Sequence, residues 1–488
     1  MNSFKSLFNN FRITFMIIMT FVFYGSAVLI SKEEKCLQNI DNKICKVSTI
    51  LSKPSYLMFN SIKETQRLLK NKSSSGLIVW DLKETEQRYK KLKKGFDFFY
   101  KPSTRKNAGY LLLSLSDPKR GGYPLIELWD LDKQKKINTF NIDLNDIYKK
   151  AKITPDKQQR LINPLLLKDG SIIIPQVGKE MAIVKLDKCG KYIKSSKEFR
   201  THHSLQSDAN GDLYTPVLLG REYIKNFNDL HPHNYTFDGF IVLDDNLNII
   251  KNYSLLDIYA KNNLLGDFYD YGSETLVSDV FHVNDVQPYI SKDGNKYVLI
   301  SHLRRSRVLA VDLDNLKILW FIERATKLQH DVDILREESN SIDISIFDNN
   351  NSQFGPLYEQ VKQHGNRVAY LSGLPLDSDA DTFIIGDKKQ FDKFKLDYFT
   401  FNKFRENLRP KTRTQGLADH LLENDSLMIE ETDYGRLFEV EISTGNILWQ
   451  YYNKGDKTNP YMISWSRRIS NLPKGLDISS FGKCKVND

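Results

Sequence analysis

The sequence predicts an all-β protein, a six-bladed β-propeller preceded by a single N-terminal transmembrane helix. Three observations predict it: an apolar run near the N-terminus, short β-rich segments separated by Asp/Asn/Gly turns, and a hairpin pattern that returns at regular spacing. Aromatic residues make up 12% of the 488 residues, which suits packed sheets. With 27% charged residues and 15 prolines, long disordered tracts are not expected.

The first element in chain order is the apolar run at 13–30. It contains no charged residue, and as a helix it can just cross a bilayer core of about 30 Å. Lys5 and Arg12 precede the run, which favours a cytoplasmic segment at 1–12 and export of the rest. A cleaved signal peptide, with the small residues Gly25 and Ala27 near the cut, is the alternative. We therefore expect the chain at the periplasmic face of the inner membrane, held there by one span.

After the run, the sequence predicts a linker with a short helix at 31–76, the propeller at 77–455, and a closing or capping segment at 456–488. Within the propeller, one pattern returns: an apolar strand, an Asp/Asn/Gly turn and a second apolar strand that ends near an aromatic residue. The five visible copies lie at 125–140, 182–195, 240–253, 308–321 and 437–451.

Equivalent positions in these hairpins give the number of blades. They are Trp129, Lys185, Val242, Val311 and Val440, at separations of 56, 57, 69 and 129 residues. The last separation is close to twice the others, so we expect a further unit between about 325 and about 400, with remnants at 344–348 and 382–399. Six units of four strands predict a six-bladed propeller, since a β-sandwich does not require near-constant spacing.

The four cysteines fit an exported protein, because disulfides form in oxidising compartments. Cys36 and Cys45 could close a small loop, and a bridge between Cys189 and Cys484 is a second option. The net charge of +9 is dispersed, without a dense Lys/Arg block, so nucleic acid is not an expected partner.

The nine histidines all lie between positions 202 and 420. Several stand beside a turn-strand repeat: the pair His202-His203, then His282, His330 and His420. Equivalent positions in successive blades lie on one face of a propeller, so these side chains are expected to converge. For a single histidine, a hydrogen bond to local backbone would be the simpler interpretation. The recurrence favours a site.

Three motifs resemble those of the bacterial arylsulfate sulfotransferase family. They are Gln329-His330-Asp331 with Phe347-Asp348-Asn349-Asn350, similar to QH…FDNG; Phe281-His282-Val283-Asn284, similar to HVN; and His202-His203 with Asn210-Gly211-Asp212, similar to HH…NGD. Order and spacing agree over roughly residues 105–455. The family's Ser-Arg-His segment is altered at 299–305, and the glycine of FDNG is replaced by Asn350.

The resemblance implies that His330 is the nucleophile and that His203, His282 and an arginine hold the sulfate. Arg304 is the first choice for that arginine. The other substrate-binding residues that we expect are His202, His302, Arg305, Asn284 and His420. Neutral imidazole, with a reference pKa near ~6.5, can attack without a separate base, and guanidinium and imidazole suit the sulfate oxygens.

The resemblance further implies ping-pong transfer from an aryl sulfate donor to a phenolic acceptor, with no cofactor, metal or nucleotide sulfate. Two other classes of function remain open: a non-catalytic envelope propeller that binds protein or glycan, and a metal- or quinone-dependent propeller enzyme. The five tryptophans lack the spacing of quinone-enzyme repeats, whereas a zinc site of three histidines stays conceivable. A homodimer is an open expectation.

Overall fold

The computed structural model describes residues 91–102, 105, 107–220, 237–266, 281–323, 325–338, 341–350, 365–376, 383–385, 394–403, 409–412, 415–455 and 461–484. The chain divides into two units, Met1–Ser73 and Ser74–Asp488, and all of these residues lie in the second. The expected span at 13–30, the linker at 31–76 and the pair Cys36 and Cys45 lie outside them. Within the described ranges, no helix is long and apolar enough to cross a membrane.

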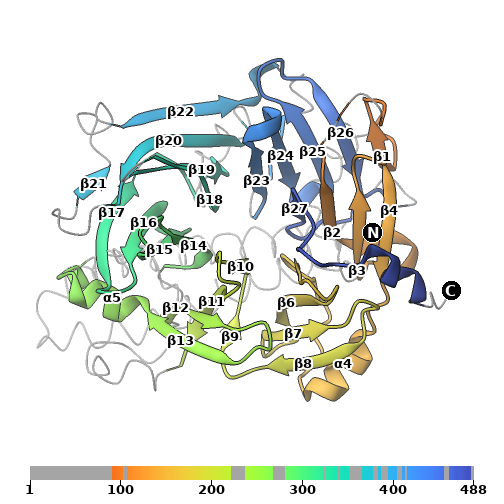
Figure 1. Ribbon diagram of the computed structural model, residues 1–488, viewed down its shortest axis with the longest axis horizontal. Coiled ribbons are helices and arrows are strands. Elements are labelled where there is room, and N and C mark those ends of the chain that lie inside the picture. The colour runs from red at the N-terminus through yellow and green to blue at the C-terminus, as the bar shows by residue number, and fades with distance from the viewer. Residues whose placement is uncertain are drawn as a thin grey trace, which may run out of the picture. The chain divides into compact units, whose positions relative to one another are not determined.

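The second unit is an all-β, six-bladed propeller, so the predicted architecture is confirmed (Figure 1). Three sheets have four strands and three have five. Blade 1 is β27 (Arg467–Ile469), β2 (Tyr110–Asp117), β3 (Tyr123–Asp130) and β4 (Lys135–Phe140). Blade 2 is β5 (Leu165–Leu166), β6 (Ile172–Val177), β7 (Ala182–Leu186) and β8 (Tyr192–Ser196). Blade 3 is β9 (Arg200–Thr201), β10 (Gln206–Ser207), β11 (Leu213–Leu219), β12 (Phe237–Leu243) and β13 (Ile249–Ser254).

The other three blades follow the same plan. Blade 4 is β14 (Val283–Ile290), β15 (Lys296–His302), β16 (Arg307–Asp312), β17 (Lys317–Glu323) and β21 (Phe383–Ile385). Blade 5 is β18 (His330–Glu338), β19 (Ser341–Asp348), β20 (Arg367–Pro375) and β22 (Lys395–Thr400). Blade 6 is β23 (Leu417–Leu421), β24 (Ser426–Glu431), β25 (Arg436–Glu441), β26 (Ile447–Tyr452) and β1 (Gly95–Phe98).

Short helices lie between strands. The α-helices are α4 (Leu144–Ala151) and α5 (Leu255–Lys261). The 3₁₀ turns are η1 (Pro118–Arg120), η3 (Phe401–Lys403), η5 (Leu422–Asn424), η6 (Thr432–Tyr434) and η7 (Ile478–Lys483). Asp143 caps the N-terminus of helix α4, because its carboxylate accepts hydrogen bonds from the main-chain N–H groups of Asn145 and Asp146.

One turn chemistry recurs between strands and explains the repeat seen in the sequence. Asp208 accepts hydrogen bonds at 2.9 and 3.0 Å from the main-chain N–H groups of Asn210 and Asp212. Gly211 completes this turn with a φ of 91°, a conformation that glycine adopts without a steric penalty. An aspartate at the first turn position therefore fixes the chain reversal.

Every blade shares a buried apolar cluster with both of its neighbours. Representative pairs in chain order are Leu128 with Val184, Ile173 with Leu213, Phe240 with Val298, Leu299 with Ile344, Phe347 with Phe438, and Met428 with Leu111. Burial of one such side chain stabilises the fold by about 1.5–3 kcal/mol. Because blade 6 also packs on blade 1, apolar burial closes the ring.

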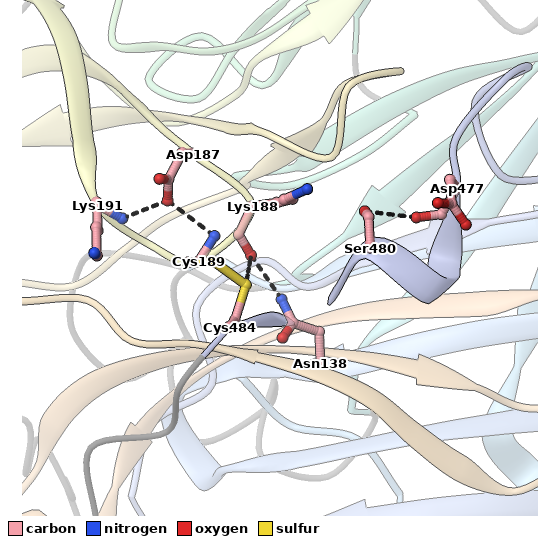
Figure 2. The surroundings of a disulfide bond; sticks show 8 residues. All are labelled: Asn138, Asp187, Lys188, Cys189, Lys191, Asp477, Ser480 and Cys484. Carbon is pink, nitrogen blue, oxygen red and sulfur yellow. Dashed lines mark hydrogen bonds between the residues drawn. A yellow bond between two sulfur atoms is a disulfide. The ribbon is translucent and has the colours of Figure 1, made fainter. Parts of the chain in front are cut away.

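The chain closes the ring with both of its described ends. Strand β27 pairs with β2 to complete blade 1, and β1 pairs with β26 at the edge of blade 6. A disulfide joins Cys189 in the β7–β8 turn to Cys484, 295 residues later, which is one of the two pairings left open by the sequence (Figure 2). The carbonyl of the neighbouring Lys188 accepts a hydrogen bond of 3.0 Å from Asn138 Nδ2, so this turn is also bonded to blade 1.

The unit that the sequence left hidden is blade 5, which runs from β18 to β22. One of its expected remnants, 382–399, divides between two blades. Its start, β21, pairs in parallel with β17 of blade 4, whereas its end, β22, pairs with β20 of blade 5. A parallel strand contributed from another part of the chain leaves no hairpin pattern in the sequence, and this explains the weak repeat there.

Candidate active site

The inner strands of the blades, among them β10, β14, β18 and β23, surround the centre of the ring (Figure 1). The candidate active site lies where these inner strands begin. Within three residues of that point in every blade, a non-glycine residue with left-handed backbone occupies the corresponding position. These residues are Trp465, Asn163, His203, His282, Asp331 and Gln415, with φ of 51°, 45°, 61°, 52°, 54° and 56°. Such a conformation costs on the order of 1–3 kcal/mol and is found preferentially at functional sites. Because this backbone conformation recurs at the start of every blade, the six residues lie around one end of the propeller axis.

Hydrogen bonds between neighbouring blades hold these strand starts. In each, a side chain of one blade accepts from a main-chain N–H of the next. The bonds are Leu205 N to Asn163 Oδ1 at 2.8 Å, Val286 N to Ser204 Oγ at 3.2 Å, Val332 N to Asp285 Oδ2 at 2.8 Å, and Ala418 N to Asp331 Oδ2 at 2.8 Å. The site is therefore built on strands that are fixed laterally as well as within each sheet.

Three of the predicted histidines meet there, each from a different blade. His203 Nε2 and His282 Nε2 are 2.9 Å apart, so one ring donates the shared proton and the other accepts it. The rings of His203 and His330 have centroids 6.2 Å apart. His202 lies beside them, with its ring centroid 5.0 Å from that of His203. Asp238 is near His202, with 3.8 Å between Oδ1 and Nε2.

The orientation of His330 follows from its two hydrogen bonds. Its Nδ1 lies 2.6 Å from Asn349 Oδ1, and Asn349 Nδ2 donates to the carbonyl of Gln415 at 2.7 Å. Because the amide nitrogen is thus used as a donor, Oδ1 is the acceptor and His330 Nδ1 carries the proton. The main-chain N–H of Gln415 points at Nε2 from 3.2 Å, so Nε2 bears the lone pair. A nucleophile needs this tautomer.

Burial keeps the rings of His330 and His203 neutral. It lowers the pKa of His330 to about 3, against the opposing effect of the hydrogen bond with Asn349. Burial also holds the pKa of His203 well below its ordinary value, and the neighbouring His282 adds to this. The main cause is the same for both residues, because a charged imidazole would lose its hydration in the buried site.

Other predicted residues lie around the cluster. Asn284 Nδ2 donates to the carbonyl of Gln329 at 2.7 Å and so supports the residue before His330. Arg304 and Arg305 lie in the β15–β16 turn, where Arg304 N donates to the carbonyl of Phe281 at 3.1 Å. This turn therefore runs alongside the residue that precedes His282.

Two predicted histidines have their ring contacts elsewhere. The buried ring of His302 packs on Phe281 at 5.0 Å, with its Nδ1 3.4 Å from the Tyr259 hydroxyl. Burial holds the pKa of His302 well below its ordinary value. The ring of His420 packs against Tyr370 at 5.3 Å. The structure does not bring these two rings to the cluster of His203, His282 and His330.

Two residues near the cluster were missed by the sequence reasoning. The ring of Trp465 lies 5.9 Å from that of His203 and 6.1 Å from that of His330. Arg160 Nη1 donates to Gln415 Oε1 at 2.7 Å. Trp465 occupies in blade 1 the position that His203 occupies in blade 3, so alignment of 464–466 with the repeat would have found it. Arg160 belongs to no repeated motif.

Across the described ranges, no group of three or more His, Cys, Asp or Glu side chains could hold a metal ion. What the geometry provides is a neutral, oriented imidazole nucleophile with further imidazoles around it. Such a site suits transfer of an electrophilic group to nitrogen.

Residues 163–454 match the model of one protein family, described as Arylsulfotransferase (ASST). The match covers more than half of the chain and includes the three histidines of the cluster. The chain belongs to the arylsulfotransferase family, which makes it, at family level, a sulfotransferase.

Comparison with individual proteins finds only distant similarity. No curated protein matches the chain. A solved protein of unknown function from Bacteroides caccae is similar at 13% identity, covering 73% of this chain and 97% of its own, with a TM-score of 0.41. A streptogramin B lyase structure is similar at 10% identity, covering 76% and 91%, with a TM-score of 0.37.

Proposed function

We propose that this chain moves a sulfuryl group from an aryl sulfate to a phenol through a sulfated His330. One observation carries the proposal: in a member of the arylsulfotransferase family, the lone pair of His330 Nε2 is oriented by Asn349 and kept unprotonated by burial. A nucleotide sulfate donor is not required.

The reaction has two half-steps. In the first, His330 Nε2 attacks sulfur, an N–S bond forms, and the S–O bond to the aryl group breaks so that the aryl oxygen leaves with the electron pair. In the second, the oxygen of the acceptor phenol attacks sulfur and the electron pair of the N–S bond returns to Nε2. The aryl oxygen leaves the first half-step as a phenolate, and the neutral His203–His282 pair can take the proton of the acceptor phenol in the second.

The remaining predicted residues take binding roles in this proposal. His203 and His282 donate to sulfuryl oxygens, and Arg304 is the arginine that the resemblance assigns to the same task. His202 packs beside the ring of His203, and Asn284 holds the main chain of Gln329, the residue before His330. Donors placed where negative charge accumulates lower the barrier more than the same donors in water would. The N–H of Gln415, which now points at Nε2, must turn from that lone pair as the N–S bond forms.

We also propose that the propeller lies on the exported side of a membrane, at the periplasmic face, anchored by the span at 13–30. The apolar run after Lys5 and Arg12 supports this topology. The disulfide between Cys189 and Cys484 supports an oxidising compartment.

The test is sulfation of His330 itself. After brief exposure of the protein to 4-nitrophenyl sulfate without acceptor, mass spectrometry should find one added SO₃ group on the peptide that contains His330, and a phenol should remove it. His330→Asn keeps a polar side chain of similar reach, and it should lower transfer on the order of 10⁴-fold or more while the melting temperature stays close to that of the wild type.

The outcomes separate the competing functions. Transfer by His330→Asn at the wild-type rate would reject the nucleophile. A wild-type protein that neither becomes sulfated nor releases 4-nitrophenol would favour the binding propeller instead.

A further inference from the structure

We propose that Arg160, from the segment leading into blade 2, binds the transferred sulfuryl group and is a substrate-binding cation of this site. This inference rests on the proposed function. It places a cation on the blade-2 side of His330, in addition to Arg304 in blade 4.

The first argument is the position of Arg160 relative to the nucleophile. Its Nη1 donates to Gln415 Oε1 at 2.7 Å, and the main-chain N–H of the same Gln415 lies 3.2 Å from His330 Nε2. One residue therefore separates the guanidinium from the attacking nitrogen. A bound group on Nε2 would lie on the side where Gln415 now donates.

The second argument is the lack of a carboxylate partner. Among the described residues, Arg160 makes no ion pair, and its hydrogen-bond acceptor is a neutral amide. Four other arginines of the propeller are paired with carboxylates: Arg105 with Glu439, Arg307 with Glu323, Arg367 with Asp348, and Arg436 with Glu431. Arg467, like Arg160, hydrogen-bonds only neutral acceptors in the described part of the chain. What distinguishes Arg160 is that its neutral acceptor is Gln415, the residue whose main-chain N–H points at His330 Nε2.

Burial makes the lack of a carboxylate partner for Arg160 costly. It lowers the pKa of Arg160, and the more distant carboxylates of Asp433, Asp156 and Glu430 only partly oppose the effect. A guanidinium that is taken out of water without a carboxylate destabilises the fold unless another anion compensates. A sulfuryl group offers three oxygens, and the planar fork of arginine can bind two of them at once.

The third argument is independent of charge. Two buried polar atoms next to His330 have no hydrogen-bond partner in the part of the chain that the structure describes: Trp465 Nε1 and His203 Nδ1. The indole N–H of Trp465 is a donor only, and its ring touches both His203 and His330. Buried polar groups are normally satisfied, and a ligand with several acceptor oxygens bound next to His330 could satisfy both of these atoms.

The experiment compares Arg160→Gln and Arg160→Lys with Arg120→Gln, a surface control in η1 whose guanidinium lies over the ring of Tyr123. With 4-nitrophenyl sulfate as donor, Arg160→Gln should lower kcat/KM on the order of 10²- to 10³-fold, as loss of one anion-stabilising donor does. Arg160→Lys should retain part of the activity, and the control should match the wild type. Dilute guanidinium should restore activity to Arg160→Ala but not to His330→Asn.

A binding arm separates this inference from the proposed function. In the His330→Asn background, calorimetry measures affinity for 4-nitrophenyl sulfate with and without Arg160→Gln, and the second substitution should weaken it. If the wild type is never sulfated, the proposed function fails whatever Arg160 does. If the wild type transfers sulfate and Arg160→Gln retains both kcat/KM and affinity, Arg160 is not a substrate ligand. Should Arg160→Gln not fold, Arg160→Lys and guanidinium rescue decide.

Discussion

The charge and the tautomer of His330 depend on two features of its surroundings, its burial and its hydrogen bond with Asn349. Burial excludes the charged ring, and Asn349 fixes which nitrogen carries the proton. The two effects are separable, because one acts on the amount of neutral imidazole and the other on its direction. A substitution at Asn349 can therefore change orientation alone or orientation and charge together.

The pH dependence of transfer tests this. With a pKa of about 3, His330 is unprotonated at about pH 5, where a histidine in water with a pKa near ~6.5 is mostly charged. The rate of His330 sulfation should therefore show no acid limb from this group between about pH 5 and about pH 8. Asn349→Asp places a carboxylate beside Nδ1–H, which favours the charged ring and should move an acid limb into this range.

Asn349→Ala is the matched control, since it removes the hydrogen bond without adding charge. It should lower the rate by about 10- to 100-fold at every pH, with no new acid limb. Stopped-flow measurement of 4-nitrophenol release across this range decides between them. An acid limb near ~6.5 in the wild type would contradict a nucleophile kept neutral by burial.

Site residues could be predicted from the sequence only where they stand at equivalent positions of the blade repeat. His203, His282 and His330 stand at equivalent blade positions, so recurrence identified them and the structure brings them together. His302 lies within β15, and its ring packs on Phe281 inside its own blade. A short sequence motif does not show toward which side of a strand a side chain points, so this position could not be predicted. Arg160 could not be predicted, because its partner Gln415 is 255 residues away and belongs to blade 6.

At the level of elements, the closure of blade 1 depends on two strands from opposite ends of the chain. Strands β2 and β27 pair from Tyr110 with Ile469 onwards. Gly109 precedes β2, has a φ of 70°, and approaches the backbone of β27 so closely that an added Cβ would lie 2.6 Å from the carbonyl oxygen of Ile469. This glycine permits both the turn and the approach.

Gly109→Ala should therefore destabilise the propeller through blade 1. The methyl group would meet backbone atoms that cannot rotate away, in addition to the conformational penalty. We expect a loss of about 2–4 kcal/mol in the free energy of unfolding, measured by urea titration. Gly121→Ala is the matched control, because Gly121 has a φ of 64° and no atom within 4 Å of the added Cβ. Equal losses for both variants would show that strain, not the approach to β27, sets the cost.

The elements themselves were predicted well where pairing is local. Hairpins have both partners within one short stretch, so alternation and turn residues identify them. Strands β1, β21 and β27 pair with strands that are distant in sequence, and nothing in their own residues specifies the partner. Sequence reasoning therefore predicted the number of blades and a closing or capping segment at 456–488, but it did not predict the partner strands of β1, β21 and β27.

For the whole molecule, the order of blades places the C-terminal segment next to the first two blades. Residues 461–484 supply β27 to blade 1 and then reach blade 2 through Cys484. The disulfide thus connects the last described residues of the chain to the outer hairpin of blade 2 (Figure 2). It encloses most of the propeller in one covalent loop, and a loop of 295 residues has many conformations to lose when unfolded.

Replacing both cysteines by serine, Cys189→Ser with Cys484→Ser, should lower the free energy of unfolding by about 2–5 kcal/mol. The main effect is on the unfolded chain, which gains the freedom that the covalent loop removed, so the folded site should retain its activity at low temperature. The measurement is urea unfolding of the wild type and the double variant, each with and without reductant. Reductant should destabilise the wild type to the level of the variant, and its effect on the variant reports Cys36 and Cys45 alone. Identical unfolding midpoints for wild type and variant in the absence of reductant would mean that apolar burial between blades, without the covalent tie, accounts for closure of the ring.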